Sequence, residues 1–316
     1  MTLVLIAFFC INTYCQPTIL VTRDKKDYYE EYTALVSSQK IKHGSYLKLD
    51  KSMVGNHSLA IFGMYSYGKK DGYWETYYKG TNNIKDKGYY KNDKKDSVWT
   101  IFYFQGVVRK FKQVQSEEGV QLQIIDANPI ISRTGNYLDD KAVGIWEFFD
   151  VHSELLQQYN YDTESLVYFK DHDLKNIETG FIGGEDLLNR FLYETFNPYG
   201  IIDSIHSTIN LKTSKMVFKF TIDERGRIKD IINTENTIRN KKIYYRAIKT
   251  IMSLDKQFYP KKVDGVSQKS EKTITFDLKV DSNTHHYSTS NEISWLTNKK
   301  FNMYITLTLL NFETKR

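Results

Sequence analysis

Residues 181–196 read FIGGEDLLNRFLYETF and open the one part of the chain that has the pattern of a complete compact fold. Two glycines interrupt the backbone, and Glu185 and Asp186 then place negative charge on the first turn of a helix. The apolar residues that follow share one helical face: Leu187, Leu188, Phe191, Leu192 and Phe196. The stretch therefore predicts an amphipathic helix that covers an apolar layer.

The residues after this helix alternate as strands do. MVFKFTID, from Met216, is apolar at every second position, and the turn DERGR, in which Gly226 can adopt a positive φ, leads into a return strand, IKDIIN. KKIYYRAIKTIM, from Lys241, predicts a second helix, and KTITFDLKV, from Lys272, predicts a closing strand. Because each strand has one apolar face, we expect a two-layer α+β domain over residues 181–280, with helices covering one side of an antiparallel sheet.

In order and spacing these segments, together with FYPKKVDG from Phe258, resemble the TonB C-terminal domain. The resemblance implies that the domain captures an extended partner peptide, such as a segment of an outer-membrane receptor, by adding it as a strand to an exposed sheet edge. By analogy the partner-binding residues lie on the closing strand: Thr273, Thr275, Phe276, Asp277 and Lys279.

The chain also departs from TonB energy transducers. Those proteins have an N-terminal membrane helix with a coupling histidine and a long proline-rich spacer, whereas this chain has 4 prolines in total. The family's Tyr-Pro step reads Asn197-Pro198-Tyr199 here, and its Leu-Asp pair reads Asn240-Lys241. The resemblance therefore extends to the fold and not to energy coupling.

The tail, residues 281–316, contains KKFNMYITLTLL, whose apolar residues from Phe301 onward alternate strictly. This pattern predicts an extra strand, and an exposed strand of this kind would be prone to aggregation. We therefore expect it to extend the C-terminal sheet, to dock on the repeats described next, or to pair with a second copy. If it covers the edge at Thr273 to Lys279, peptide capture requires its displacement.

The middle of the chain, residues 40–165, is a repeat. GMYSYGKKDGYWETYY, GYYKNDKKDSVWTIFY and GNYLDDKAVGIWEFFD align, and a partial copy, KHGSYLKL, precedes them. The signature residues are Gly63, Tyr65, Trp74, Gly88, Tyr90, Trp99, Gly135, Tyr137 and Trp146. The tryptophan intervals are 25 (99 less 74) and 47 (146 less 99), which indicates one period and then roughly two. Each unit predicts a β-hairpin, and the hairpins pair edge to edge into an antiparallel ribbon.

The repeat resembles MORN-type repeats in the divergent form found in YwqK-family antitoxins. The matched tryptophans are expected to form the core of the ribbon, with a stacking face for peptide or glycan as the alternative. The turn lysines Lys69, Lys70, Lys94 and Lys95 are expected to be solvated. Residues 166–180 are expected to be a polar linker to the C-terminal domain.

At the N-terminus, LVLIAFFCI is too short to span a bilayer as a helix and predicts a signal peptide over residues 1–15. An apolar strand, or a lipid anchor on Cys10 or Cys15, is the alternative. Both cysteines of the chain lie in this segment, so the mature chain is expected to have no disulfide and no thiolate metal site. We expect export to the periplasm or to the periplasmic face of the outer membrane, without an integral membrane segment after cleavage.

Composition and motifs exclude several classes of function. The net charge of +6 is spread along the chain without a recognition motif, so no nucleic-acid partner is expected. No nucleophile elbow, phosphate-binding loop, zinc spacing or pair of catalytic carboxylates is found in the sequence. Asp171-His172-Asp173 and His285-His286 lack convergent partners. We therefore expect that the chain has no catalytic residues and binds no cofactor or metal. We also expect that it is not an enzyme.

The sequence thus suggests a mainly β protein: a hairpin repeat ribbon followed by a TonB-like α+β domain that binds envelope proteins at sheet edges. Two alternatives stay open. One is a structural repeat scaffold whose C-terminal domain is only a cap, and the other is a cytoplasmic, antitoxin-like repeat protein. The pattern leaves the oligomeric state open.

Overall fold

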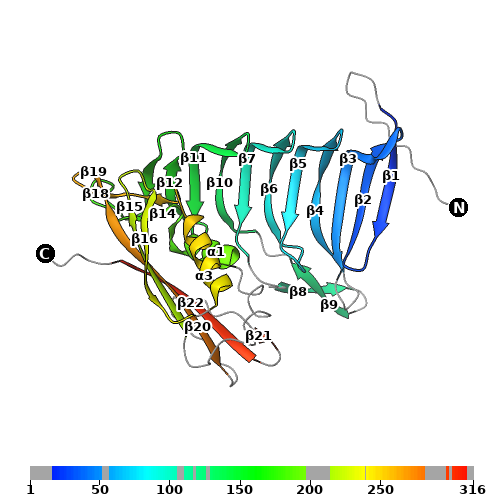
Figure 1. Ribbon diagram of the computed structural model, residues 1–316. Coiled ribbons are helices and arrows are strands. Elements are labelled where there is room, and N and C mark those ends of the chain that lie inside the picture. The colour runs from blue at the N-terminus through cyan, green and yellow to red at the C-terminus, as the bar shows by residue number, and fades with distance from the viewer. Residues whose placement is uncertain are drawn as a thin grey trace. The chain divides into compact units, whose positions relative to one another are not determined.

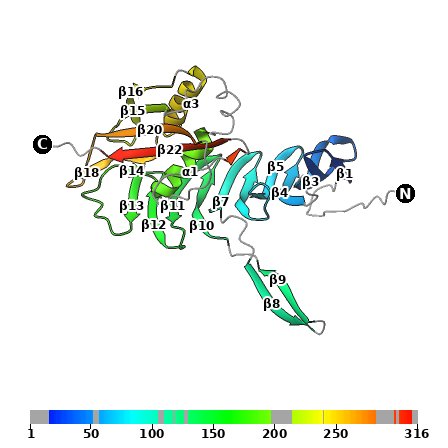
Figure 2. The same ribbon diagram turned by 90° about the horizontal axis from the view of Figure 1, so that it is seen from below.

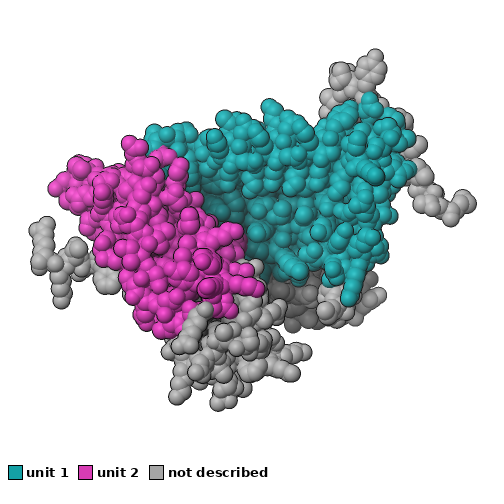
Figure 3. Space-filling model, in the orientation of Figure 1, with its two compact units in different colours: residues 1–163 teal, residues 164–316 magenta. Residues whose placement is uncertain are grey.

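The structure is a computed structural model, and its elements are shown in Figure 1. It describes residues 16–51, 57–104, 110–116, 119–125, 129–196, 214–238, 240–281, 297–298 and 301–311. The predicted signal peptide, the Asn197-Pro198-Tyr199 step and His285-His286 lie outside these residues. The chain divides into two compact units, residues 1–163 (unit 1) and residues 164–316 (unit 2), coloured separately in Figure 3.

Unit 1 is built of strands: β1 (Thr18–Asp24), β2 (Tyr28–Leu35), β3 (Ser38–Lys51), β4 (His57–Ser66), β5 (Lys69–Tyr77), β6 (Ile84–Lys91), β7 (Lys94–Phe102), β8 (Lys110–Ser116), β9 (Gly119–Ile125), β10 (Ile131–Leu138), β11 (Lys141–Phe149) and β12 (Leu155–Asn160). Within the residues that the structure describes, eleven strands form one antiparallel sheet in the order β1-β2-β3-β4-β5-β6-β7-β10-β11-β12-β13, where β13 is Ser165–Phe169. The prediction of a mainly β chain with a long antiparallel hairpin sheet is confirmed. The sheet begins at Thr18, upstream of the predicted repeat, with the hairpin β1–β2.

The 47-residue interval between Trp99 and Trp146 does not contain two repeat periods. Strands β8 and β9 pair only with each other, as a separate two-stranded sheet (Figure 2), and β7 pairs directly with β10, so that Trp99 faces Gly135. The interval is therefore one repeat step plus an inserted hairpin. Residue spacing cannot distinguish an insert from a second period, because only strand pairing reveals which hairpin leaves the sheet.

Unit 2 contains β13, β14 (Gly180–Phe181), α1 (Gly184–Phe196), β15 (Ser214–Ile222), β16 (Ile228–Asn236), α3 (Lys241–Met252), β17 (Phe258–Tyr259), β18 (Lys261–Val263), β19 (Val266–Gln268), β20 (Ser270–Asp281), β21 (Thr297–Asn298) and β22 (Phe301–Asn311). Its main sheet has the strand order β16-β15-β20-β22-β21. Unit 2 also has two small two-stranded sheets, β14-β17 and β18-β19.

Both helices pack on one face of this sheet. The Phe196 ring of α1 lies 5.0 Å from the ring of Phe276 on β20, and Tyr244 of α3 lies 5.8 Å from Phe218 on β15. The fully buried side chains on this side come from alternate strand positions and from one stripe of each helix: Leu188, Leu192, Phe196, Phe218, Phe220, Ile243, Ala247, Ile251, Ile274 and Phe276. At the start of α3 the Asn240 side chain accepts hydrogen bonds from the amides of Lys242 and Ile243, as an N-cap does.

Residues 166–180 differ from the expected polar linker. The segment holds β13, and its second half is bound within unit 2 at two points. Buried Ile177 exchanges backbone hydrogen bonds with Lys262, and the hydroxyl of buried Thr179 donates to the Tyr259 carbonyl at 2.8 Å. Burial of Ile177 and the hydrogen bond of the Thr179 hydroxyl to a backbone carbonyl fix this stretch in unit 2, although its composition is polar. Among the described residues, no helix is both long and apolar enough to cross a bilayer.

Candidate functional site

The edge of β20 is paired rather than open. β20 lies between β15 and β22, and β22 pairs with it antiparallel at ten consecutive positions, from Lys272 opposite Asn311 to Asp281 opposite Asn302. Of the three placements expected for the tail, the structure has the first, in which it extends the C-terminal sheet. A partner strand at this position would have to take the place of β22.

The five residues proposed to bind a partner differ in where they lie. Phe276 is 0% exposed, and its ring contacts Phe218 and Phe196 in the core under the helices, so it cannot reach a partner. Thr273 is buried and Thr275 is half-buried, and both are on the opposite face of the strand. Asp277 and Lys279 follow on β20, where they lie opposite Thr306 and Tyr304 of β22. The assignment of this strand to partner binding stays a prediction, and Phe276 does not fit that role because strand alternation places its side chain in the core.

The other edge of the sheet, β16, is irregular. Its pairing with β15 shifts register twice, between Val217 and Phe218 and again between Lys219 and Thr221, and Asp230 has a φ of +53°. Bulges of this kind break the regular row of backbone donors and acceptors that an added strand needs.

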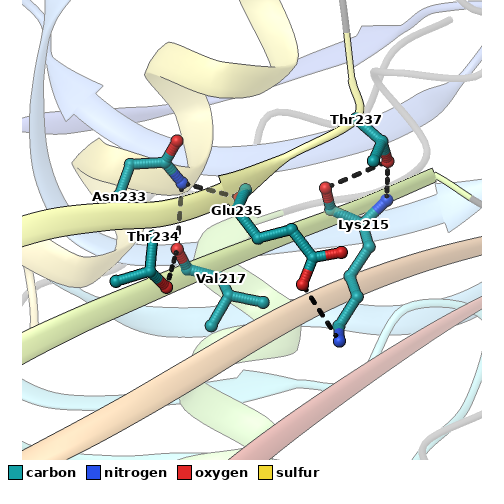
Figure 4. A network of polar contacts seen from close by, with 6 residues as sticks. All are labelled: Lys215, Val217, Asn233, Thr234, Glu235 and Thr237. Atoms are coloured by element: carbon teal, nitrogen blue, oxygen red, sulfur yellow. Dashed lines mark hydrogen bonds and ion pairs between the residues drawn. The ribbon is translucent and has the colours of Figure 1, made fainter.

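Side chains close the hairpin where the first bulge interrupts it (Figure 4). The Asn233 amide donates to the carbonyl of Val217 and to that of Glu235, each at 2.9 Å, and the Thr234 hydroxyl donates to the same Val217 carbonyl. Lys215 and Glu235 form an ion pair at 3.3 Å across the two strands. These polar contacts join β16 to β15 or lie within β16, whereas β20 pairs with β22 in regular register at ten positions.

The turn between β15 and β16 is held by one carboxylate. Asp223, 7% exposed, accepts hydrogen bonds from the amides of Arg225 and Arg227 and from the Arg227 guanidinium. Burial alone would raise the pKa of Asp223, but the two amides and the guanidinium outweigh it and hold the pKa below its usual value. Gly226 follows with a φ of +74°, and a Cβ there would meet the Phe258 carbonyl. The interpretation of Asp223 as a turn residue is confirmed.

In unit 1 the repeated tryptophans form a core and not a binding face. Trp74, Trp99 and Trp146 are 1–2% exposed. Each indole lies against the glycine of the preceding strand and donates to the backbone carbonyl of the residue after that glycine, at 2.9 to 3.0 Å. Tyrosines stand edge-on between them, so that the rings form one continuous ladder: Tyr46, Tyr65, Trp74, Tyr90, Trp99, Tyr137, Trp146 and Tyr161. Since the rings are buried, the stacking-face alternative for these tryptophans is wrong.

Two of the four turn lysines belong to this ladder. The Lys70 ammonium lies 4.6 Å from the Trp74 ring centroid, and Lys95 lies 4.0 Å from that of Trp99, so the expectation that both are merely solvated is wrong. Burial lowers the pKa of Lys95. The signal that was missed is positional, because a lysine stands four residues before the ring in three hairpins: Lys42, Lys70 and Lys95.

The aspartates of the turns hold these lysines in place. The Lys70 amide donates to the Asp93 carboxylate at 2.7 Å, and the Asp93 amide donates back to the Lys70 carbonyl. Asp140 and Lys95 repeat the arrangement in the next hairpin. In these two places a turn is hydrogen-bonded to the turn of the next hairpin, so polar contacts join the hairpins in addition to the aromatic core.

The Asp171-His172-Asp173 segment forms a loop. The His172 ring stacks on Phe169 at 3.8 Å, and Asp173 accepts from the Lys175 amide and the Asn176 side chain. Among the described residues, no group of histidine, cysteine and carboxylate side chains has the arrangement of a metal site. Comparison with family models, with curated proteins and with solved structures gave no match to this chain.

Proposed function

We propose that this chain is a non-enzymatic protein-interaction protein whose unit 2 binds an extended segment of a partner by β-strand addition along β20. The observation that carries the proposal is the pairing of β20 with β22, which supplies a regular ten-position ladder on that side of the sheet. The resemblance to the TonB C-terminal domain supports it, because strand addition at this edge is what that resemblance implies.

The chemistry of strand addition fits this edge better than the edge at β16. An incoming strand gains affinity from backbone hydrogen bonds and specificity from alternate side chains. β20 provides a regular backbone ladder over Lys272 to Asp281, whereas the pairing of β16 has two register shifts. The partner is therefore expected to replace β22 rather than to add outside β16.

Photo-crosslinking in cells tests the proposal. A photoreactive amino acid at Thr275, half-buried on β20, is expected to capture a partner protein that mass spectrometry identifies. The same group at Ile232, 56% exposed on β16, is the matched control and is expected to capture none. If Thr275 gives only links within the chain, or if both positions give the same products, strand addition at β20 is refuted.

The proposal includes export, on the basis of the apolar run LVLIAFFCI near the N-terminus. The partner would then be an envelope protein, such as an outer-membrane receptor. N-terminal sequencing of the protein purified from cells is expected to begin at Gln16. Retention of residues 1–15 in a cytoplasmic fraction would contradict export and favour the antitoxin-like alternative.

A further inference from the structure

We infer that β22 is a built-in substitute for the partner strand, so that its own pattern describes the partner. The partner segment would be an extended stretch, antiparallel to β20, with apolar residues at every second position and threonine or a similar residue at the positions that match 306 and 308. This inference rests on the proposed function, because it assumes that β20 is the strand on which partners bind.

The register between β20 and β22 shows at which positions the added strand needs an apolar residue. β22 pairs with β20 without a register shift, and residues 309 and 307 lie directly opposite Ile274 and Phe276. Residues directly opposite each other in an antiparallel pair lie on the same face of the sheet. Ile274 and Phe276 are both 0% exposed under the helices. Positions 307 and 309 of the added strand therefore share a face with Ile274 and Phe276, and the sequence has leucine at both.

The other face of the sheet sets a different requirement. Position 308 of β22 lies opposite Thr275, and position 306 lies opposite Asp277. Both positions are threonine, which has a high preference for strands and a hydroxyl that is compatible with a half-exposed face. A partner with lysine or glutamate in phase with 307 and 309 would have to bury a charge beside Phe276, which is strongly unfavourable.

The attachment of β22 to the same chain makes it a competitor. A tethered segment acts at an effective concentration that reaches the millimolar range for short flexible linkers. A partner then binds only the fraction of molecules in which β22 has left, and its apparent affinity falls by that fraction. Segments that match poorly would therefore fail to displace β22, whereas segments with the same alternation of apolar residues would bind in its place.

A reversible lock on β22 tests this inference in the full chain. Thr275→Cys with Thr308→Cys joins two directly opposite positions, in a Cys10→Ser, Cys15→Ser background that removes the other thiols. Opposite Cα atoms in antiparallel pairs are about 4.5–5.5 Å apart, which suits a disulfide. The matched control is Val217→Cys with Glu235→Cys, an opposite pair between β15 and β16.

The probe is a fluorescein-labelled synthetic peptide with the sequence of residues 299–311, KKFNMYITLTLLN. Its binding is followed by fluorescence anisotropy, with a second peptide that carries lysine in place of Leu307 and Leu309. We expect the oxidised Thr275–Thr308 lock to weaken binding at least about tenfold, a difference of about 1.4 kcal/mol, and reduction to restore it. The control lock is expected to leave binding unchanged, and the lysine-bearing peptide is expected not to bind the reduced protein.

Three results would overturn the inference. They are equal binding to locked and reduced protein, equal binding of the two peptides, and a concentration-dependent dimer that the lock abolishes, which would assign the edge to a second copy of the chain. Failure of the inference is distinguishable from failure of the proposed function. If Thr275 captures a partner whose segment lacks the alternation, only the inference fails. If the reduced protein binds the peptide but Thr275 captures no partner, the function fails.

Discussion

Gly88 lies directly under the indole of Trp99. A Cβ built on Gly88 would come within 2.4 Å of the Trp99 ring, and the same relationship links Gly63 with Trp74 and Gly135 with Trp146. Glycine is required at these positions because the neighbouring ring occupies the volume that any side chain would need. The repeat signature of glycine and tryptophan is therefore one packing contact that recurs along the sheet.

Gly88→Ala should destabilise unit 1. The added methyl group overlaps the Trp99 ring, which is 1% exposed, so we expect a loss of about 1–3 kcal/mol in the free energy of unfolding. Urea unfolding followed by tryptophan fluorescence measures it. Lys91→Ala, at an exposed position of the same strand, is the control, and an equal effect of the two changes would contradict the packing account.

Lys95→Met should destabilise unit 1 more than Lys94→Met does. The Lys95 ammonium lies 4.0 Å from the Trp99 ring centroid, whereas Lys94 is exposed, in a pair with Asp139 at 3.4 Å. Cation–π contacts contribute about 0.5–2 kcal/mol, and methionine keeps most of the apolar stem, so this is the expected difference. Thermal unfolding of both variants at one salt concentration measures it, and equal midpoints would show that the ring contact has no energetic weight.

Asp223 should make unit 2 sensitive to acid. Its pKa in the folded chain is lowered below the value of an unfolded aspartate, so its contribution is complete above the unfolded pKa and is lost as the pH falls through the folded pKa. We expect the stability difference between the parent and Asp223→Asn to shrink as the pH is lowered from 6 toward 3. Urea titrations across that range measure it, and a constant difference would exclude this carboxylate as the cause.

Lys272 should make the stability of unit 2 depend on pH in the alkaline range, with the same sign as Asp223 in the acid range. Burial lowers its pKa to about 8, although Glu178 and Glu185 favour the charged form. The unfolded chain binds more protons than the folded chain between pH 8 and the normal lysine value, so stability rises with pH in that interval. Lys272→Met is expected to remove this rise and to stabilise unit 2 at pH 7. A parent and variant with the same pH profile from 7 to 10 would contradict the expectation.

The elements of the fold were largely accessible from the sequence, because alternation and helical periodicity follow directly from the side on which a residue is buried. The tryptophan core of the ribbon followed from the repeat, whereas the strand on which a partner is proposed to bind comes from the resemblance to the TonB C-terminal domain and stays a prediction. The pairing of strands was not accessible. Whether β22 pairs with β20, and whether β8 and β9 stay in the sheet, depends on contacts between distant residues.

The same limit explains the errors in the candidate residues. Phe276 was grouped with Thr275 because both lie on one strand, although their side chains point to opposite faces. The sequence places Lys70 and Lys95 in turns, but the neighbouring hairpin binds their backbone amides through Asp93 and Asp140, and their ammonium groups lie over the Trp74 and Trp99 rings. The sequence shows which residues are charged, but the contacts of each charged side chain depend on the neighbouring hairpin.

The hairpin β8–β9 leaves the sheet, β7 pairs directly with β10, and the glycine and tryptophan contacts are kept in the hairpins on either side, Gly88 with Trp99 and Gly135 with Trp146. The number of repeated hairpins in the sheet is therefore given by the number of glycine and tryptophan contacts, and not by the number of residues between successive tryptophans. Loops that join neighbouring hairpins are free to lengthen, and the chain can acquire new appendages there at little expense to the ladder. The loop after β7 is accordingly the natural position for grafting a tag or a foreign domain into this scaffold.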